Sequence, residues 1–503
     1  MALCIGRKKS DAGFPPEAAG TTVKWLQITV HKIVGNPPLF LKQTPRRSCF
    51  YKSNKLHSAL VLTINILNKS TMPANQPPAR VLNAYDIKVL SLASLGGALE
   101  YYDFIIFIFF AKTFGDQFFP ADLSPFWKTL NTYGTFAIAY FMRPVGGVIM
   151  AHFGDLVGRK RMFTLSIVLM ALPTFCIGFL PTFEHIGYAA PLLLLLMRMV
   201  QGIAIGGEIP GAWVFVSEHV PPKRIGIANG MVTSGLTLGI LLGSLMALLI
   251  NSSFSKPDIT AFAWRIPFFV GGILGFVTVY LRGYLHETPV FKEMQAMKTL
   301  NQGLPIATVW NEHKPAILIS ILATWLLTAG IVVVILFAPE LMKSPYFNIP
   351  AKVTLTMQSL AIVALATGCI FTGWMCDKVG VGKTFIGMCA ALAVSSSIFY
   401  HSIGNADYAT LSSMYVVTGF FVGIVGGVPY IMVHAFPAKI RFSGLSFSYN
   451  LSYAIFGGLT PLFLGYVNAI NPLSASYYVV FLSIMGVFCG WYLLKNSRSE
   501  LSN

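Results

Sequence analysis

The sequence contains little charge for its length. Only 11% of its 503 residues are charged, against about 25% in an average soluble domain, while 55% are hydrophobic. A soluble chain of this size still exposes about a quarter of the surface of its unfolded state, and so few charges cannot cover that area. The composition therefore excludes a water-soluble globular protein and indicates a chain whose apolar surface lies against lipid.

Several chemistries lack the residues that they need. The chain has 7 Cys, and they show no C-x-x-C or metal-ligand spacing, which argues against a disulfide scaffold and against a zinc site. It has no Gly-rich phosphate loop ending in Lys-Ser or Lys-Thr, so it lacks a built-in ATPase site. We therefore expect no metal, no other cofactor and no enzymatic activity.

The positive charge is unevenly distributed. The chain has 36 Lys and Arg against 19 Asp and Glu, a net charge of +17. Residues 1–71 hold 11 basic and 2 acidic residues, net +9, which leaves +8 for all the rest. Because no basic stripe is interleaved with stacking aromatics, we do not expect a nucleic-acid partner.

This basic leader has three interpretations. It is too polar to span a bilayer, since its one apolar run, 59–67, is short. It is a cytoplasmic arm on anionic lipid, an organellar targeting segment, or an upstream stretch that is absent from a mature protein starting at Met72. We favour the third interpretation, because Met72 precedes the first long apolar run at a distance that is typical of the family that the motifs described below resemble.

Twelve long apolar runs follow the leader. Crossing about 30 Å of hydrocarbon takes roughly 20 such residues, and each run is close to that length. An even number places both termini on the same side of the membrane. The runs are 89–112, 130–152, 162–182, 189–216, 226–250, 263–284, 315–341, 354–375, 384–403, 410–434, 444–469 and 476–494.

The loop charges predict the orientation. The five loops on the side of the termini and their flanks carry 13 Lys and Arg, Arg282 among them, against 6 on the opposite side. Cytoplasmic loops are enriched in Lys and Arg, so both termini are expected in the cytoplasm.

A short motif occurs twice, six spans apart. An Asp is followed by a Gly turn and basic residues after the second run and again after the eighth, which indicates two halves related as copies. Such an Asp can bind the exposed amides of a neighbouring helix start or pair with a cation. These contacts could hold the cytoplasmic side of the protein closed in one conformational state and break in the other. The alternative is that both are ordinary positive loops. The first copy comprises Gly154, Asp155, Gly158, Arg159 and Lys160, and the second comprises Gly373, Asp377, Lys378 and Gly380.

These motifs and several others, in order along the chain, resemble the major facilitator superfamily. Within it, they resemble the metabolite:proton symporters, which include proline/betaine, 2-oxoglutarate, citrate and shikimate carriers. The resemblance implies an all-α integral membrane protein with twelve transmembrane helices in two pseudo-symmetric six-helix bundles. Besides the two loop motifs, it is carried by residues 97–104, 143–147, 198–208, 264–268, 287–291 and 436–444.

The expected organisation follows from the runs and the resemblance together. A basic extension, 1–85, precedes an N-terminal bundle, 86–286, and a cytoplasmic linker, 287–314, leads to a C-terminal bundle, 315–494, with a short tail, 495–503. We expect the protein to lie in a cell membrane, namely the inner membrane of a bacterium, and to work as a monomer.

Five ionisable residues lie inside the runs of the first half, away from the ends of the runs. Each costs about 2.5–3.5 kcal/mol at membrane depth, so each is a functional candidate. Proton coupling needs a carboxyl whose charge changes, since burial favours its neutral form and a nearby cation its ionised form. Glu100 and Asp103, on one helical face, and Glu208 are the candidates, with Arg143 or Arg198 as the cation. The alternative is a static network of buried ion pairs.

The substrate candidates follow from the same charges. An anionic metabolite needs a cation, for which Arg143 and then Arg198 are best placed, with Gln201, Tyr102 and Tyr133 as further contacts. A zwitterion such as proline or betaine could instead use the carboxylates and aromatic faces for its positive end. In the fifth run, the predicted helix interface is a small-residue ladder of Gly235, Gly239 and Gly243, which allows close helix contact.

The combined interpretation is a secondary active transporter that carries a small organic metabolite together with protons by alternating access. Its partners are then the substrate, protons and the lipid bilayer. The alternatives are a proton-independent facilitator of the same substrates and a membrane receptor that transports nothing.

Overall fold

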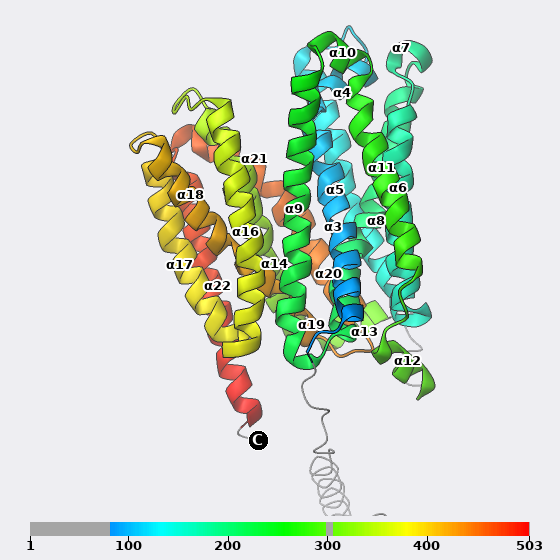
Figure 1. The fold of residues 1–503 in the computed structure, drawn as a ribbon, viewed down its shortest axis with the longest axis vertical. Helices are drawn as coiled ribbons and strands as arrows, with labels where there is room; N and C mark the ends of the chain where they lie inside the picture. Colours follow the sequence, from blue (N-terminus) through cyan, green and yellow to red (C-terminus); the bar gives the residue numbers. More distant parts are fainter. Residues whose placement is uncertain (1–80, 298–304, 502–503) are drawn as a thin grey trace, which may run out of the picture. The chain divides into compact units, whose positions relative to one another are not determined.

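The computed structural model describes residues 81–297 and 305–501. The basic leader and the start proposed at Met72 lie outside the described residues. Every regular element in the described part of the chain is helical, as the sequence predicts. The long helices run roughly side by side (Figure 1).

The first half contains six long helices, in the positions of the first six apolar runs. Short helical turns connect them. The long helices are α3 (Ala84–Phe109), α5 (Pro125–Val157), α6 (Arg159–Phe179), α8 (Ala189–His219), α9 (Ile225–Ser253) and α11 (Ile266–Gly283); the connections hold α4 (Ala111–Phe118), α7 (Phe183–Ile186), η1 (Pro222–Arg224), α10 (Lys256–Ala261) and η2 (Ala263–Arg265).

The second half has the same number of spans, but three of them change helix type along their length. Two short helices, α12 (Pro289–Ala296) and α13 (Pro305–Glu312), lie in the predicted linker. The elements of the second half are α14 (Lys314–Gly330), η3 (Ile331–Phe337), α15 (Ala338–Lys343), α16 (Ala351–Val379), α17 (Val381–Ser402), α18 (Tyr408–Val422), η4 (Gly423–Gly427), α19 (Val428–Ala435), α20 (Arg441–Ser452), η5 (Tyr453–Gly457), α21 (Gly458–Ile470) and α22 (Ser474–Leu501).

Eleven helical stretches of the described residues are long and apolar enough to cross a membrane. They coincide with all the predicted runs except 444–469. That run is occupied by α20, η5 and α21, which follow one another without a gap from Arg441 to Ile470. Its α-helix is interrupted by a π-helical segment at Tyr453–Gly457, so it forms a span composed of three pieces.

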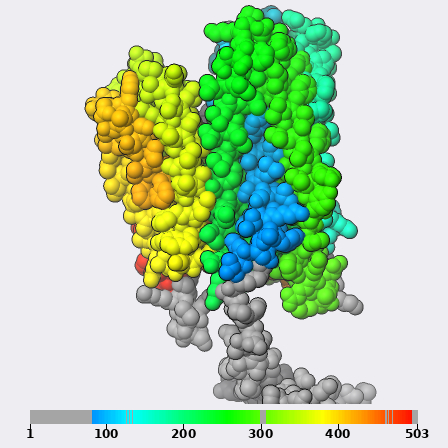
Figure 2. Space-filling model, viewed as in Figure 1, coloured from blue at the N-terminus to red at the C-terminus, as the bar shows by residue number. Residues whose placement is uncertain are grey.

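Glycines let certain helices approach unusually closely. A Cβ atom on Gly202 would overlap the backbone of Ala139, and one on Gly206 would overlap the backbone of Arg143, so α8 lies directly against α5. Between the halves, Gly226 on α9 and Gly373 on α16 meet backbone to backbone. Figures 1 and 2 show α16, in yellow, beside α9, in green, with α3, in blue, between α9 and α11.

The outer faces of the helices are apolar. Leu242, Leu245, Leu248 and Leu249 of α9 are all about half exposed, and Phe488 of α22 is 65% exposed. A water-soluble protein rarely exposes contiguous apolar surface of this kind. This surface fits the hydrocarbon of a bilayer.

Candidate functional site

Among the described residues, three buried ion pairs lie within the apolar runs of the first half. They join Glu100 to Arg143, Asp103 to Arg198, and Glu208 to an arginine of α11 that the sequence did not single out. Glu100 and Asp103 therefore do not share one proton site with one cation. Although they are three residues apart on α3, each carboxylate has its own guanidinium partner.

Asp103 lies at the centre of a network that joins α3, α6 and α8. Arg198 Nη1 donates to Asp103 Oδ2 at 2.9 Å and to Gln201 Oε1 at 2.8 Å. Gln201 Nε2 and Thr174 Oγ1 donate to Asp103 Oδ1 at 3.1 and 3.0 Å. The Arg198 guanidinium lies 3.6 Å from the centroid of the Phe107 ring. Both oxygens of Asp103 are thus satisfied within the protein.

Glu100 has a less complete set of partners. Its Oε1 accepts a hydrogen bond from Arg143 Nη2 at 3.0 Å. No group of the described residues hydrogen-bonds to Glu100 Oε2 or to Arg143 Nη1, although both atoms are buried. The Arg143 guanidinium lies 5.0 Å from the ring centroid of Tyr140 and 4.7 Å from that of Tyr453, which belongs to the second half.

Glu208 is held by Arg282, and here the sequence expectation was wrong. Arg282 was counted among the loop charges, but it is fully buried and donates to both carboxylate oxygens of Glu208. Ser166 Oγ also donates to Glu208 at 2.6 Å, and Arg282 Nη1 donates to the carbonyl of Phe163. The signal was present, since Arg282 lies within the predicted run 263–284.

Two of the other predicted substrate contacts lie elsewhere or are not described. The Tyr102 hydroxyl donates to the carbonyl of Pro267 at 2.9 Å, so this side chain binds α11 rather than Arg143 or Arg198. The side chain of Tyr133 is outside the described residues. Gln201 belongs to the Asp103 network.

The two loop motifs lie at the same end of the bundle, which we call the motif end. Asp155 pairs with Arg159 at 2.8 Å and accepts the backbone N–H of Ser443, at the start of α20, at 2.9 Å. In the second copy, Asp377 accepts the backbone N–H groups of Gly226 and Ile227, at the start of α9, at 2.7 and 2.8 Å. Each Asp thus caps a helix of the opposite half.

The glycines and lysines of the motifs have distinct positions. Gly158 and Gly380 have φ angles of 132° and 89°, which disfavour any side chain, so they form the turns. Gly154 packs against the ring of Phe442. Lys160 Nζ donates to the carbonyl of Gly283 at 3.0 Å, while Lys378 lies 4.8 Å from the centroid of the Trp374 ring.

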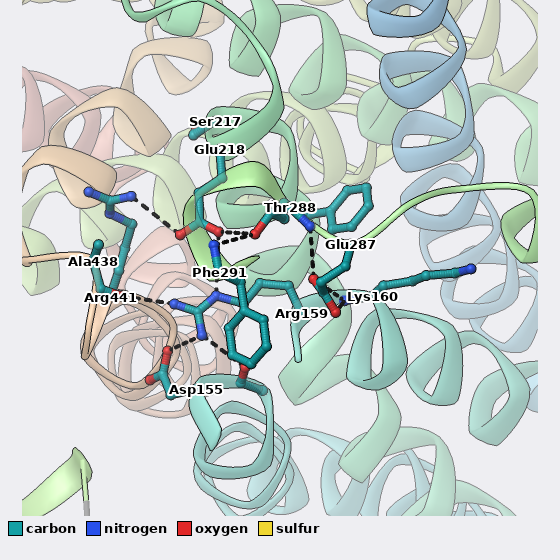
Figure 3. Close-up of polar contacts among 12 residues, drawn as sticks. Asp155, Arg159, Lys160, Ser217, Glu218, Glu287, Thr288, Phe291, Ala438 and Arg441 are labelled. Carbon is teal, nitrogen blue, oxygen red and sulfur yellow. Dashed lines mark hydrogen bonds and ion pairs between the residues drawn. The ribbon is translucent and has the colours of Figure 1, made fainter. Parts of the chain in front are cut away.

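Figure 3 shows a carboxylate at this end that the sequence did not single out. Glu218, at the end of α8, forms an ion pair with Arg159 at 3.4 Å. It accepts hydrogen bonds from Arg441 of the second half at 3.3 Å and from the Thr288 hydroxyl at 2.7 Å. Its position was visible as a repeat, since Glu218 precedes a proline by three residues, as His434 does in the second half.

Glu287, from the segment before α12, adds a further contact at the motif end. Its carboxylate accepts the backbone N–H of Lys160 at 3.1 Å, at the start of α6 (Figure 3). Negative charge is favourable at a helix start, because the first amides of the helix have no partner within it.

The predicted glycine ladder faces α3. A Cβ atom on Gly235 would meet Ser94, one on Gly239 would overlap the backbone of Ala98, and one on Gly243 would meet Ile105. The three glycines thus bring α9 against the helix that carries Glu100 and Asp103. In the part of the chain that the structure describes, no three His, Cys, Asp or Glu side chains are arranged to hold a metal ion.

Comparison with known proteins identifies the fold. The chain resembles a double tryptophan mutant of XylE, with a TM-score of 0.69 and 17% identity over 82% of this chain and 96% of that one. The inward open xylose transporter XylE from E. coli gives a TM-score of 0.57, again at 17% identity over 82% and 96% of the two chains. The twelve-helix fold predicted from the sequence is thereby confirmed.

Comparison of sequences identifies the family. The chain is 30% identical over 435 residues, 82% of its length, to the glycine betaine/proline/ectoine/pipecolic acid transporter OusA of Dickeya dadantii, covering 84% of that protein. It is equally similar, with the same coverage, to a proline/betaine transporter of Salmonella typhimurium. The family model of the Major Facilitator Superfamily matches residues 93–461. The chain therefore belongs to the Major Facilitator Superfamily, and it is a multi-pass membrane transporter rather than an enzyme.

Proposed function

We propose that the protein is a proton-coupled symporter of a small zwitterion, such as proline or glycine betaine, working by alternating access. The substrate class is supported by the relatives, which are named as proline, betaine, ectoine and pipecolic acid transporters. All four are small molecules with a positive and a negative end. The proton coupling is inferred from the chain's own buried charges.

The Asp103 network carries this proposal. It is a buried carboxylate in direct contact with a buried guanidinium, on helices of the bundle interior. Burial favours the neutral carboxyl and the cation favours the ionised one, so a modest rearrangement shifts the balance between them. Protonation of Asp103 removes the charged partner of Arg198 and leaves the guanidinium with Gln201, which makes it freer to move.

Glu100 and Glu208 are the other two proton candidates predicted from the sequence. Arg282 donates to both oxygens of Glu208, whereas Arg198 donates to only one oxygen of Asp103. The cation therefore holds Glu208 more firmly, which favours a structural role for this residue. Glu100 retains an unpartnered oxygen, so it is more open to an incoming group. We assign the proton to Asp103 and compare the other two directly in the test.

The motif end supports the alternating access. Asp155 caps α20 and Asp377 caps α9, so two reciprocal contacts close this end of the bundle. The ion pair of Arg441 with Glu218 and the hydrogen bond from Arg159 Nη2 to the Ala438 carbonyl add further contacts between the halves. These contacts must break when the halves rock apart at this end, as alternating access requires. The positive charge of the loops supports a cytoplasmic position for the motif end and both termini, in a bacterial inner membrane.

The test is transport by the purified full chain in proteoliposomes. Radiolabelled proline and glycine betaine should accumulate inside under an imposed inward proton gradient, and a protonophore should abolish the accumulation. Asp103→Asn should lose gradient-driven accumulation while keeping exchange of internal for external substrate. Glu100→Gln and Glu208→Gln are compared in parallel, and Asp116→Asn, which changes an exposed carboxylate, is the control.

Each outcome has a defined meaning. Undiminished proton-driven accumulation by Asp103→Asn would overturn the assignment of the proton to this residue. Transport unaffected by the protonophore would make the protein a proton-independent facilitator. Binding of proline or betaine without flux would make it a receptor, and uptake of citrate or 2-oxoglutarate with neither zwitterion would overturn the substrate class.

A further inference from the structure

The ion pair between Glu100 and Arg143 has unused bonding capacity. Both side chains are almost completely buried, with 1% and 4% of their residue surfaces exposed. One carboxylate oxygen, Oε2, and one guanidinium nitrogen, Nη1, have no hydrogen-bond partner among the described residues. A buried acceptor and a buried donor without partners are costly to maintain, and such a pair of atoms suits a ligand that supplies a partner for each.

The two other buried pairs within the apolar runs of the first half lack this combination. Outside those runs, at the motif end, Asp155 Oδ1 and Arg159 Nε also have no hydrogen-bond partner, but there Asp155 Oδ1 lies 2.8 Å from Arg159 Nη1 in an ion pair. Asp103 accepts hydrogen bonds at both oxygens, from Arg198, Gln201 and Thr174. Glu208 also accepts at both oxygens. Arginine nitrogens without partners occur in these pairs as well, but of the three carboxylates only Glu100 has an oxygen left to accept a donor.

Aromatic faces surround the Arg143 guanidinium. It lies 5.0 and 4.7 Å from the ring centroids of Tyr140 and Tyr453, whose planes are within 12° of parallel. Tyr449 packs against Tyr453 with ring centroids 5.0 Å apart. The faces of tyrosine rings attract cations, ammonium ions as well as guanidinium. In this structure, the guanidinium of Arg143 stands where the positive end of a ligand would be attracted.

This cluster lies at the junction of the two halves. The hydroxyl groups of Tyr101, on α3, and Tyr453, on η5, are 2.9 Å apart. Tyr453 is the first residue of the π-helical segment that interrupts the eleventh span. Short π-helical segments within α-helices frequently occur at functional sites. A ligand at this point would contact both halves at once, which alternating access requires.

We propose that Glu100 and the ring faces of Tyr140 and Tyr453 bind the positive end of a zwitterionic substrate, and that Arg143, which occupies this subsite here, moves to bind its carboxylate. The proposal deepens the proposed function and rests on it. One buried ion pair becomes two, because the substrate ammonium pairs with Glu100 and the substrate carboxylate pairs with Arg143.

Charge balance is the reason for a zwitterion. An anion bound to Arg143 would leave an ionised Glu100 without its partner, and a cation bound to Glu100 would leave Arg143 without one. An unpaired buried charge is strongly unfavourable, whereas a zwitterion leaves none. A simple carboxylate would therefore bind well only with Glu100 protonated.

The first test uses the unaltered protein and two ligands of the same shape. Binding to the purified full chain is measured by calorimetry for glycine betaine and for tert-butylacetate, in which carbon replaces the charged nitrogen. Glycine betaine should bind at least about tenfold more tightly, since cation–π contacts in a desolvated site contribute on that order. Equal affinities would overturn the proposal, and this comparison requires no variant to fold.

The second test changes the rings. Tyr140→Phe, which keeps the ring face, should stay within about twofold of the unaltered protein, while Tyr140→Leu and Tyr453→Leu should each lose about tenfold in betaine affinity. Tyr466→Leu is the matched control, because Tyr466 lies on α21, in the same span as Tyr453, and is 74% exposed. Unchanged betaine affinity in folded Tyr140→Leu and Tyr453→Leu proteins would overturn the assignment of the rings.

The third test changes the carboxylate. Glu100→Gln should weaken proline binding by about tenfold or more, because the proline ammonium loses its ionised acceptor. Full proline affinity in this variant would overturn the role of Glu100. The outcomes are separable from those of the proposed function: if the unaltered protein binds neither zwitterion, the proposed function fails, whereas zwitterion binding that ignores Tyr140, Tyr453 and Glu100 refutes the subsite alone.

Discussion

The pair between Glu208 and Arg282 gives the most direct prediction about stability. Arg282 is fully buried, and its charge is balanced by Glu208 alone among the described carboxylates. Glu208→Gln removes that charge but keeps nearly the same shape. The guanidinium would retain the carbonyl of Phe163 and the Phe163 ring, whose centroid lies 3.6 Å away.

The size of the effect follows from the burial. Removing one partner of a buried ion pair typically costs about 3–5 kcal/mol, because the other charge is left uncompensated. In the Glu208→Gln variant, the side-chain amide oxygen still accepts one hydrogen bond from Arg282, so we expect the lower end of this range, about 3 kcal/mol. Removing both charges with Glu208→Gln and Arg282→Met together should recover most of the loss.

The assay measures the free energy of unfolding of the purified protein in mixed micelles, which are titrated with a denaturing detergent. Both single variants and the double variant are measured. Asp116→Asn, an exposed carboxylate, is the control and should leave the stability unchanged. A cost below about 1 kcal/mol for Glu208→Gln, or a double variant no more stable than the singles, would refute the reasoning.

Three further predictions concern helix contacts. Asp377→Ala removes both bonds to the start of α9, so it should open the motif end. Opening is measured as faster alkylation of Ser446→Cys, a buried position between the halves, in a background without native cysteines. An unchanged alkylation rate would contradict the capping role. Glu218→Gln should cost about 1–3 kcal/mol of unfolding free energy by weakening the Arg159 and Arg441 bonds, and stability equal to that of the unaltered protein would argue against this. Gly239→Ala should cost about 1–3 kcal/mol, because its Cβ overlaps the backbone of Ala98. Gly387→Ala, a matched helical glycine with open space around it, should instead stabilise by about 0.5–1 kcal/mol, and equal effects of the two substitutions would show that packing is not the cause.

Much of the candidate site was visible in the sequence as a set of residues. Glu100, Asp103, Arg143, Arg198 and Glu208 stand out because charge is rare in apolar runs, and the structure buries all five. The two Asp motifs were recognisable from their repetition. The prediction that such an Asp can bind the amides of a neighbouring helix start follows from elementary helix electrostatics, and both do so.

The pairing of these residues could not be obtained in the same way. Nothing in the sequence says that Glu100 binds Arg143 while Asp103, one turn away, binds Arg198. Arg282 was taken for a loop charge, and Glu218 was not singled out, because both lie near the end of an apolar run. Tyr453 was not singled out either, since one tyrosine among 20 carries no local signal.

The sequence by itself determined the twelve spans, their repetition and the rarity of buried charge, because hydropathy and turn motifs are properties of neighbouring residues along the chain. The tertiary structure decided which charges meet and which rings face them. Tyr101 and Tyr453 are 352 positions apart, and their contact depends on how helices rotate and how closely glycines let them pack. Packing across the whole bundle determines this rotation and this spacing, and neither can be read from a local sequence pattern.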